Sequence, residues 1–467
     1  MQKKHESFQN LEGEKLKTSL RFKNVAVLGL GKSGLAVSNL LIKCKANVFL
    51  SELKDDPALK KRFKNKKISC EFGSHSDQIL KNDLILISPG VPLELPILQK
   101  ARRRGIPVWN ELELGLRLLK AKTIASITGT NGKTTTVSLL ADICKNAGRK
   151  VILAGNVGQP LTLFVKNQKK NDCVILEVSS YQLEALNKFH FQAACVLNLT
   201  NDHLHRHKTM QRYAKIKQKI FLNQDPSDIS VLNWDDPWCI KMARKVKGKK
   251  IWFSTRKVLK HGVYWDKEKK KIIAKFKQNN QILSFNNPKY LLGLHNSANA
   301  CASIALSLGL KIKPKAIRHS LEHFKGVAHR LEKVRVFKGI SFLNDSKATN
   351  VDSTLKALEA LDSPLWLILG GEDKGGSYLP LKKIIQEKKN VRGILLIGGA
   401  SKKIYSEVQG ACKMFFSTTL QNAIKKTVKL AQKGETVLLS PACASFDQFK
   451  NFEDRGDQFK TIVKNLK

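Results

Sequence analysis

A glycine-rich loop at residues 128–135, here called the phosphate loop, has the residue types that bind the phosphates of a nucleotide. It reads Thr-Gly-Thr-Asn-Gly-Lys-Thr-Thr after a short apolar stretch, so a strand would lead through a glycine turn into a helix. Glycines let backbone N–H groups converge on one anion, while the lysine can reach the outer phosphates and a threonine hydroxyl can hold Mg²⁺. The loop is shorter between its glycines than the common ATP-binding pattern, but the run Lys-Thr-Thr-Thr favours nucleotide binding over a turn that only joins two elements. The predicted ATP contacts in this loop are Gly129, Thr130, Asn131, Gly132, Lys133, Thr134 and Thr135.

A second glycine turn lies near the N-terminus, where Gly29, Gly31 and Gly34 form the pattern Gly-x-Gly-x-x-Gly between a predicted strand and a predicted helix. Glu52 ends the next predicted strand, near the place where an NAD-binding fold has its ribose-binding acid. A dehydrogenase is therefore one alternative. A chain with a separate ATP loop does not need NAD, so we favour a nucleotide-diphosphate substrate at this turn.

Carboxylate and imidazole side chains follow two further predicted strands. Glu177 ends an apolar stretch at 174–176, and His203, His205 and His207 follow the strand predicted around 193–200. Ligands gather at strand ends in open α/β sheets, and hard cations beside ATP would need oxygen ligands such as Glu177 and Thr134, with imidazole as an occasional helper. The alternating histidines could instead form a transition-metal site, but no fourth ligand lies near them in the sequence.

Three stretches of the chain alternate short apolar strands with helical periodicity, which is typical of parallel sheets covered by helices. We therefore predict an α/β protein with a Rossmann-like N-terminal domain, a central mononucleotide-binding domain that holds the phosphate loop, and a Rossmann-like C-terminal domain. The predicted boundaries are 1–20 for a disordered extension, 21–120, 121–326 and 327–467. A lysine-rich segment at about 241–287 predicts hairpins or surface loops within the central domain. Strands are predicted at 24–30, 47–52, 83–90, 174–180, 193–200, 339–345, 365–371, 393–399 and 436–442, and a helix is expected to end near Lys43.

The formal net charge of +45 is the most unusual bulk property of this 467-residue chain. Lys and Arg neutralise nucleic-acid phosphates, but here they are spread along the chain without an RNA-recognition, homeodomain or zinc-finger pattern. Compositional bias is the favoured interpretation, and nucleic acid is not an expected partner. No apolar run reaches the roughly 18–20 residues of a membrane helix, and the N-terminus lacks the apolar core of a secretion signal. Nine scattered cysteines fit a reducing cytoplasm.

A series of motifs then occurs in a fixed order: TGTNGKTTT, AGNVG at 154–158, EVSSYQLE, NLTNDHLHRH, GLHNSANACAS at 293–303, HRLE at 329–332, NDSKATN at 344–350, LGGEDKG at 369–375 and SPACASFDQFKNFEDRGDQF at 440–459. With these motifs the sequence resembles the Mur ligases from about Val25 to the C-terminus. It is most similar to the branch that adds D-glutamate to UDP-N-acetylmuramoyl-L-alanine in peptidoglycan precursor synthesis. The resemblance implies an ADP-forming ligase in which ATP converts a carboxylate to an acyl phosphate and the amine of D-glutamate attacks it.

The resemblance also implies roles for individual residues and two Mg²⁺ sites. Thr134 and Glu177 would hold the first Mg²⁺, while His203 and a carbamylated Lys217 would help to hold the second. The carbamate is needed because an unmodified lysine cation would repel the metal. The implied catalytic residues are Lys133, Asn156, His203 and Lys217. The other implied contacts are Asn296, Arg330 and Asp345 for ATP, Gly31, Lys32, Ser33, Glu52, Asn156 and Ser179 for the UDP substrate, and Lys347, Thr349, Lys374, Ser445 and Phe452 for D-glutamate.

The sequence departs from the family pattern at two of these places. His205 stands where the family usually has Asp, which affects the hydrogen bonding around His203, and Glu52 replaces an Asp. Two alternative functions stand beside the D-glutamate-adding ligase: a ligase of the same architecture with another amino-acid specificity, and a basic ATP-dependent nucleic-acid-binding protein. Because residues of two domains would serve one nucleotide, we expect open and closed forms of a cytoplasmic monomer.

Overall fold

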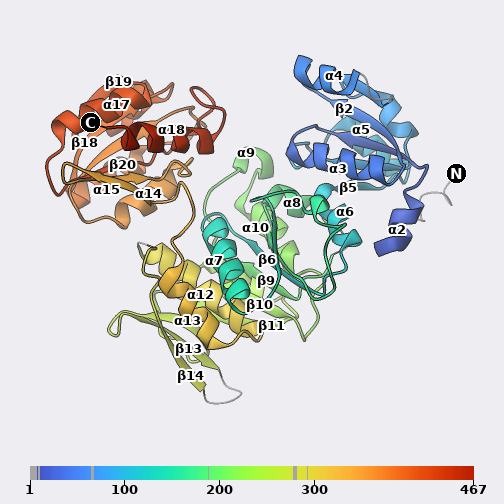
Figure 1. Cartoon of the computed structure of the whole chain (residues 1–467), viewed down its shortest axis with the longest axis horizontal. Helices are drawn as coiled ribbons and strands as arrows, with labels where there is room; N and C mark the ends of the chain where they lie inside the picture. The colour runs from blue at the N-terminus through green and yellow to red at the C-terminus, as the bar shows by residue number, and fades with distance from the viewer. Residues whose placement is uncertain are drawn as a thin grey trace. The chain divides into compact units, whose positions relative to one another are not determined.

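The computed structural model describes residues 8, 11–64, 68–187, 189–276, 281–291 and 293–466. They form two compact units, one of Met1–Phe285 with Asn299–Ser320 and one of Asn286–Ala298 with Leu321–Lys467. Three sheets of mainly parallel strands are covered by helices, so the predicted α/β class is confirmed (Figure 1). Residues 286–298 and 321–326, which were predicted in the central domain, group with the C-terminal unit.

The N-terminal sheet has five parallel strands in the order β3-β2-β1-β4-β5. Its central strand β1 (Asn24–Leu28) has four successive buried residues, as expected for a parallel strand covered on both faces. A Cβ atom on Gly34 would lie 1.9 Å from the carbonyl oxygen of Gly29, so only glycine lets the following helix begin this close to the strand. The other elements are β2 (Asn47–Glu52), β3 (Ser69–Phe72), β4 (Leu84–Ile87), β5 (Val108–Asn110), α3 (Lys32–Lys43), α4 (Pro57–Lys64), η2 (Asp77–Lys81), α5 (Pro96–Arg103) and α6 (Glu111–Leu118).

The described part of the predicted disordered extension is ordered, which corrects that expectation. Helix α2 (Gly13–Ser19) packs against α6, and Leu16 and Leu20 are fully buried in the core of the N-terminal sheet together with Phe8. Leu16 and Leu20 lie four residues apart and so share one face of the chain as it turns. The prediction failed because two leucines among many charged residues are a weak signal, whereas their burial against a neighbouring sheet stabilises the helix.

The central sheet has nine strands in the order β14-β13-β12-β11-β10-β9-β6-β8-β7. In the order of the sheet, each neighbouring pair of strands from β12 through β11, β10, β9, β6 and β8 to β7 is parallel. Strands β12 and β13 form an antiparallel pair, so the lysine-rich segment contains the predicted hairpin. The strands are β6 (Thr123–Thr128), β7 (Val151–Gly155), β8 (Cys173–Glu177), β9 (Ala193–Val196), β10 (Ile229–Asn233), β11 (Lys249–Ser254), β12 (Gly262–Asp266), β13 (Lys271–Phe276) and β14 (Gln281–Asn286). The helices are α7 (Lys133–Asn146), η3 (Leu161–Leu163), α8 (Ser180–Glu184), α9 (Leu204–His207), α10 (Met210–Gln218), η4 (Lys219–Phe221), α11 (Pro237–Ala243), α12 (Leu294–Gly309) and α13 (Pro314–His323).

The C-terminal sheet has six strands in the order β15-β16-β20-β17-β18-β19, in which only the β15–β16 pair is antiparallel. Separate clusters of buried apolar residues fill its two sides. The elements are β15 (Glu332–Phe337), β16 (Ile340–Asn344), β17 (Leu365–Gly370), β18 (Val391–Ile397), β19 (Lys413–Thr418), β20 (Thr436–Leu439), α14 (Val351–Glu359), α15 (Leu379–Lys388), α16 (Ser401–Val408), α17 (Leu420–Leu430) and α18 (Phe452–Lys464). Among the residues described, no helix has both the length and the apolar character needed to cross a membrane.

Candidate active site

The phosphate loop joins strand β6 to helix α7, as predicted. Gly129 and Gly132 have φ values of +153° and +85°, which side-chain-bearing residues rarely adopt. Asn198, at the end of the neighbouring strand β9, fixes the turn: its carbonyl oxygen accepts from the Thr130 N–H at 2.9 Å and its Oδ1 from the Asn131 N–H at 2.9 Å. The N-terminus of the 14-residue helix α7 directly follows this turn, so its partial positive charge favours an anion there.

The side chain of Lys133 lies over the phosphate loop. Its Nζ donates to the carbonyl oxygens of Gly129 at 3.0 Å and Thr130 at 2.7 Å. A phosphate held by the loop would offer a charged acceptor in place of these neutral carbonyls, and charge-assisted hydrogen bonds are about twice as strong. The lysine is therefore placed to transfer its hydrogen bonds to a nucleotide.

A chain of hydrogen bonds links the first turn of α7 to the ends of β8 and β7, and in it Thr134 and Glu177 are buried whereas Asn156 is exposed. The Thr134 hydroxyl donates to Glu177 Oε2 at 2.7 Å, and Asn156 Nδ2 donates to Glu177 Oε1 at 2.8 Å. Gly155 permits this contact because a Cβ atom there would lie 2.3 Å from the Glu177 carbonyl oxygen. Hydroxyl and carboxylate oxygens are the ligands that Mg²⁺ prefers, so Thr134 and Glu177 fit the predicted first metal site.

The predicted contact Ser179 has a structural role at the start of helix α8. Its hydroxyl accepts from the Gln182 N–H at 3.3 Å and, in return, Gln182 Oε1 accepts from the Ser179 N–H at 3.0 Å. This reciprocal pair is a capping box, which satisfies N–H groups that the helix itself leaves unpaired. Ser179 follows Glu177 by two residues, so the capping box fixes the backbone just after this carboxylate.

His203 lies beside Tyr181 and Asp202. Its Nδ1 is 3.1 Å from the Tyr181 hydroxyl, and its Nε2 is 3.4 Å from Asp202 Oδ2. His207 is fully buried instead, with Nε2 2.9 Å from the Ser180 hydroxyl and its ring stacked on Tyr213. His207 therefore packs as a core residue, and the described histidines do not assemble the alternative transition-metal site. The side chain of His205 lies outside the described part of the chain.

Lys217 is buried directly below the phosphate loop. Its Nζ donates to the Gly129 carbonyl oxygen at 2.8 Å and to the Thr128 hydroxyl at 3.2 Å, and it lies 4.7 Å from the ring centre of Tyr213. Burial, followed by the charge of Lys133, lowers the pKa of Lys217 well below its ordinary value. A neutral amine is the form that can react with CO₂, so the environment fits the carbamate implied by the resemblance.

The N-terminal glycine turn presents its predicted residues at the start of α3. Glu52 Oε2 accepts from the Leu30 N–H at 2.6 Å, so this carboxylate holds the turn. Gly31 and Lys32 are exposed and Ser33 is partly exposed at the N-terminus of the 12-residue helix, where backbone N–H groups favour an anion. The arrangement fits a diphosphate.

Predicted ATP contacts in the C-terminal unit lie around Asp345. Its carboxylate accepts from the Leu331 N–H at 3.3 Å and from the Ser440 hydroxyl at 2.8 Å. Burial raises the pKa of Asp345 to about 7, and the nearby Arg330 partly opposes that shift. Asn296 is also buried in this unit. Arg330 and Asp345 are thus brought together as predicted.

The predicted D-glutamate residues also lie in the C-terminal unit, and the structure brings two of them together. Lys347 Nζ lies 5.3 Å from the centre of the Phe452 ring. Ser445 is buried, whereas Thr349 is partly exposed and Lys374 is exposed on a loop.

Arg455, which sequence reasoning missed, connects the loops that carry these residues. It is fully buried, and its guanidinium donates to the Ser346 carbonyl oxygen at 2.8 Å and to the carbonyl oxygens of Cys443 and Ala444 at 3.2 Å. Lys347 and Ser445 follow these acceptors directly in the sequence. The sequence offers one signal for this role, because Arg455 lies inside the C-terminal motif at 440–459. Its hydrogen-bond partners can be identified only from the fold.

Two tyrosines of the central sheet region were also missed. Tyr181 contacts His203, and the hydroxyl of Tyr213 is 3.3 Å from the Thr130 hydroxyl of the phosphate loop while its ring faces Lys217. Tyr181 lies inside the motif EVSSYQLE, and Tyr213 follows the motif NLTNDHLHRH in the sequence. A tyrosine has a polar hydroxyl on an apolar ring, which suits a position between the core and the site.

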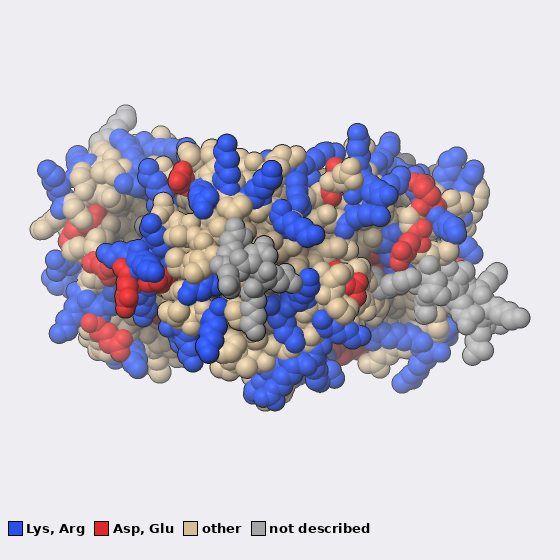
Figure 2. All heavy atoms as spheres, turned by 90° about the horizontal axis from the view of Figure 1, so that it is seen from below, with Lys and Arg blue, Asp and Glu red and all other residues tan. Residues whose placement is uncertain are grey.

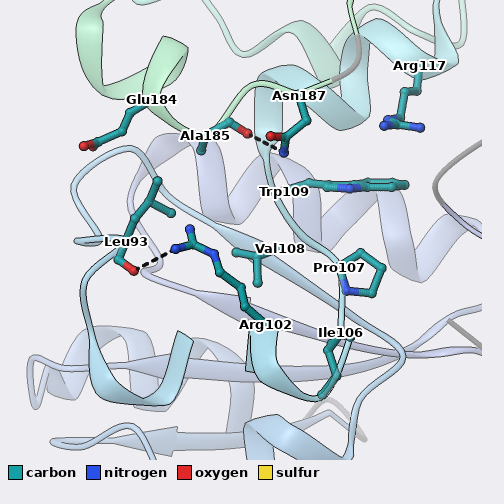
Figure 3. Close-up of a pocket in the computed structure, with 11 residues that line it drawn as sticks. Leu93, Arg102, Ile106, Pro107, Val108, Trp109, Arg117, Glu184, Ala185 and Asn187 are labelled. Carbon is teal, nitrogen blue, oxygen red and sulfur yellow. Dashed lines mark hydrogen bonds between the residues drawn. The ribbon is translucent and has the colours of Figure 1, made fainter. Parts of the chain in front are cut away.

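A cavity of about 560 Å³ lies beside the edge strand β5, away from this site (Figure 3). The Arg102 guanidinium points into it and donates to the Leu93 carbonyl oxygen at 3.4 Å. The guanidinium of Arg117 lies 4.2 Å from the Trp109 ring centre and pairs with Glu113 at 2.6 Å. The described residues that line the cavity include none of the predicted site residues.

Comparisons with known proteins agree with this arrangement of three sheets and a phosphate loop. Three family models match: the Mur ligase MurD-like N-terminal domain at residues 23–110, the Mur ligase middle domain at 127–307 and the Mur ligase glutamate ligase domain at 329–443. The chain belongs to the Mur ligase family.

Two similar curated proteins share the name UDP-N-acetylmuramoylalanine–D-glutamate ligase. The protein of Koribacter versatilis is 41% identical over 462 residues, which is 96% of this chain and 98% of its own. That of Caldanaerobacter subterraneus subsp. tengcongensis is 42% identical over 458 residues, with 96% and 99% covered.

Solved structures share the fold at lower identity. UDP-N-acetylmuramate–alanine ligase of Thermotoga maritima has a TM-score of 0.61 and 19% identity, with 95% of this chain and 100% of the other covered. The MurF ligase of Thermotoga maritima, solved in complex with ADP, has a TM-score of 0.58 and 18% identity, with 96% and 97% covered.

Proposed function

We propose that this protein joins D-glutamate to UDP-N-acetylmuramoyl-L-alanine at the expense of ATP, in peptidoglycan precursor synthesis. Curated relatives that carry this activity in their names are about 40% identical over nearly the whole chain. The observation that carries the proposal is the phosphate loop with its hydrogen-bonded chain Thr134–Glu177–Asn156, because this chain supplies cation-binding oxygens beside the place where a triphosphate would bind.

The reaction needs ATP because a carboxylate is a poor electrophile. The carboxylate of the alanyl substrate attacks the γ-phosphorus of ATP, ADP leaves, and an acyl phosphate forms. The D-glutamate amine then attacks the acyl carbon, loses a proton, and expels inorganic phosphate from the tetrahedral intermediate to leave the amide. Phosphoryl transfer of this kind depends mainly on positioning and charge neutralisation.

The residues of the central sheet region have distinct roles in this proposal. Lys133 binds the γ-phosphate and neutralises charge on it, and Asn156 orients the Glu177 carboxylate. Thr134 and Glu177 would hold one Mg²⁺, and His203 with Lys217 would help to hold a second. Bound Mg²⁺ supplies positive charge beside the phosphate oxygens.

We further propose that Lys217 is carbamylated. The neutral Nζ would add to CO₂ and lose a proton, which converts a cation donor into an anionic oxygen ligand. Its position next to Thr128 and Gly129 supports this role, because the modified side chain would lie against the phosphate loop.

The C-terminal unit would supply contacts to both small substrates. Arg330, Asp345 and Asn296 would bind ATP. Lys347 would pair with a carboxylate of D-glutamate, and the hydroxyl groups of Thr349 and Ser445 would donate to it. Lys374 and Phe452 would complete that site. A cytoplasmic location fits the nine free cysteines, and the monomeric state stays a prediction.

The test is phosphate release by the purified protein with ATP, Mg²⁺ and UDP-N-acetylmuramoyl-L-alanine while single amino acids are added in turn. We expect release with D-glutamate and an amide product of the matching mass. Release with L-alanine, a diamino acid or nucleic acid instead of D-glutamate would contradict the proposal. Lys133→Ala should lower the rate by roughly 100-fold or more, whereas Lys145→Ala, an exposed lysine in the last turn of α7, should leave it unchanged.

A further inference from the structure

The outer strands of the central sheet carry basic side chains on the face opposite helix α12, which is called the outer face here. In the register of β11, β12 and β13, this face carries Lys250, Trp252, Ser254, Tyr264, Asp266, Lys271, Ile273 and Lys275. Tyr264 and Ile273 are buried there in a small apolar cluster with Leu259, and Trp252 packs both against this cluster and against a larger core cluster to which α11 contributes Cys239 and Met242.

The opposite side of the same strands is a conventional core. Val263, Ile272 and Ala274 are fully buried there. Gly309, at the end of α12, lies so close to Ile251 that a Cβ atom on it would be 3.3 Å from Cδ1. Helix α12 therefore packs on this side of the strands.

Basic residues are concentrated around this face. Residues 241–275 contain 14 Lys and Arg against 2 Asp and Glu, so this short segment carries +12 of the net charge of +45. All of these basic residues except Lys275 are exposed. Figure 2 shows the side of the protein seen from below, where Lys and Arg greatly outnumber Asp and Glu. The basic residues are Lys241, Arg244, Lys245, Lys247, Lys249, Lys250, Arg256, Lys257, Lys260, Lys267, Lys269, Lys270, Lys271 and Lys275.

Aromatic rings lie among these cations. Trp234 is 37% exposed, and its ring meets that of Trp252 edge-on, with the ring centres 4.9 Å apart. Lys275 Nζ lies 5.5 Å from the centre of the Tyr264 ring, and Lys241 Nζ lies 4.9 Å from the Trp238 ring. Trp234 is the exposed ring of this group, because Trp238 and Trp252 are only partly exposed and Tyr264 is buried. Proteins use exposed aromatic rings among phosphate-neutralising cations to stack and hold unpaired bases.

We propose that the outer face, with Trp234 and the basic residues around it, binds single-stranded nucleic acid. The lysines would neutralise backbone phosphates and release counterions, and Trp234 would stack on a base. Strands β9 and β10 lie between the phosphate-loop strand β6 and β11, the nearest strand of the outer face. An anionic membrane fits less well, because a lipid surface needs a broad apolar face, and Val258 is the one large exposed hydrophobic residue among those described in residues 241–275.

Binding is measured by fluorescence anisotropy with a labelled oligouridylate of about 20 nucleotides, long enough to span a basic groove. The test variant combines Lys250→Glu, Lys257→Glu, Lys260→Glu and Lys271→Glu. We expect it to bind at least tenfold more weakly than the unchanged protein, with a slope of log K against log salt smaller by about 3. Trp234→Leu should weaken binding about fivefold or more with little change in that slope.

A matched control carries the same number of charge reversals elsewhere: Lys402→Glu, Lys425→Glu, Lys429→Glu and Lys433→Glu, all exposed residues of the C-terminal unit. Both quadruple variants should keep the ligase activity, which shows that they fold. Equal loss of binding in the two variants would mean that the overall charge attracts the oligonucleotide, and would overturn the proposal. Tighter binding to phosphatidylglycerol vesicles than to the oligonucleotide would overturn it as well.

Discussion

The hydroxyl of Thr134 donates a 2.7 Å hydrogen bond to Glu177 Oε2, and both side chains are buried. This contact joins the first turn of α7 to the end of β8, and its two residues are 43 positions apart in the sequence. A Mg²⁺ ion held by the same two oxygen atoms would replace this hydrogen bond, so we expect metal binding and the order of the phosphate loop to be coupled.

Substitution of Thr134 tests that coupling. Thr134→Val keeps the shape but removes the hydroxyl, and we expect a rate lower by about 100-fold together with a higher Mg²⁺ requirement. Thr134→Ser keeps the hydroxyl and should retain most of the activity. The measurement is the steady-state rate over a series of Mg²⁺ concentrations, and equal activity of the two variants would refute the metal role.

Lys217→Ala should reduce the rate by at least about 100-fold, because the carbamate oxygens that would face the metal are lost. A short carboxylate such as formate could occupy the space and restore part of the rate. Lys215→Ala, an exposed neighbour on α10, is the control and should behave normally. Mass spectrometry in CO₂-rich buffer offers an independent readout, and an unmodified Lys217 in active protein would contradict the carbamate.

Asp345 predicts a pH dependence of stability in the C-terminal unit. Its pKa is about 7 in the folded protein because it is buried, against 3.8 for an ordinary Asp. Between these values the folded state keeps a proton that the unfolded state has lost, so the free energy of unfolding falls as the pH rises from about 4 to about 7. The full cost is on the order of 4 kcal/mol.

Asp345→Asn removes this titration, and its amide oxygen can accept from the Leu331 N–H while its NH₂ group donates to the Ser440 hydroxyl oxygen. We expect the variant to lose less stability than the unchanged protein when the pH rises from about 5 to about 8. Thermal unfolding at both values measures the effect. Parallel pH dependences of the two proteins would show that Asp345 is not the group responsible.

Lys347→Met should raise the KM for D-glutamate by tenfold or more while the KM for ATP changes little, because the substitution removes the cation and retains the apolar stem above Phe452. Lys356→Met is the comparison, since Lys356 pairs only with the nearby Glu359 on the surface of α14 among the ion pairs described. Equal effects on both KM values would indicate general damage to the C-terminal unit.

The elements around the N-terminal glycine turn could be predicted closely from the sequence. Strand β2 has the predicted bounds 47–52, and α3 ends at Lys43 as expected. Strand β2 is a short apolar run and α3 is a periodic run that begins after Gly31, so local sequence determines them. The site residues Thr134, Glu177 and Asn156 also come together, because parallel strands end at one edge of the sheet.

Contacts between distant segments could not be predicted in the same way. Arg455 would be expected at the surface, yet it is fully buried because it meets carbonyl oxygens of two loops that only the fold brings together. The composition of the outer face depends on the register of β11, β12 and β13, which residue spacing alone does not specify. Tyr181 and His203 likewise meet across 22 residues.

The N-terminal helix α2 precedes residue 23, where the match to the family's N-terminal domain begins. A shortened protein designed from that boundary would lack Leu16 and Leu20 and would leave the apolar surface they cover open to water. Such a surface promotes aggregation. Light scattering should therefore show association of the truncated protein, and purification tags are better placed at the C-terminal end of the chain.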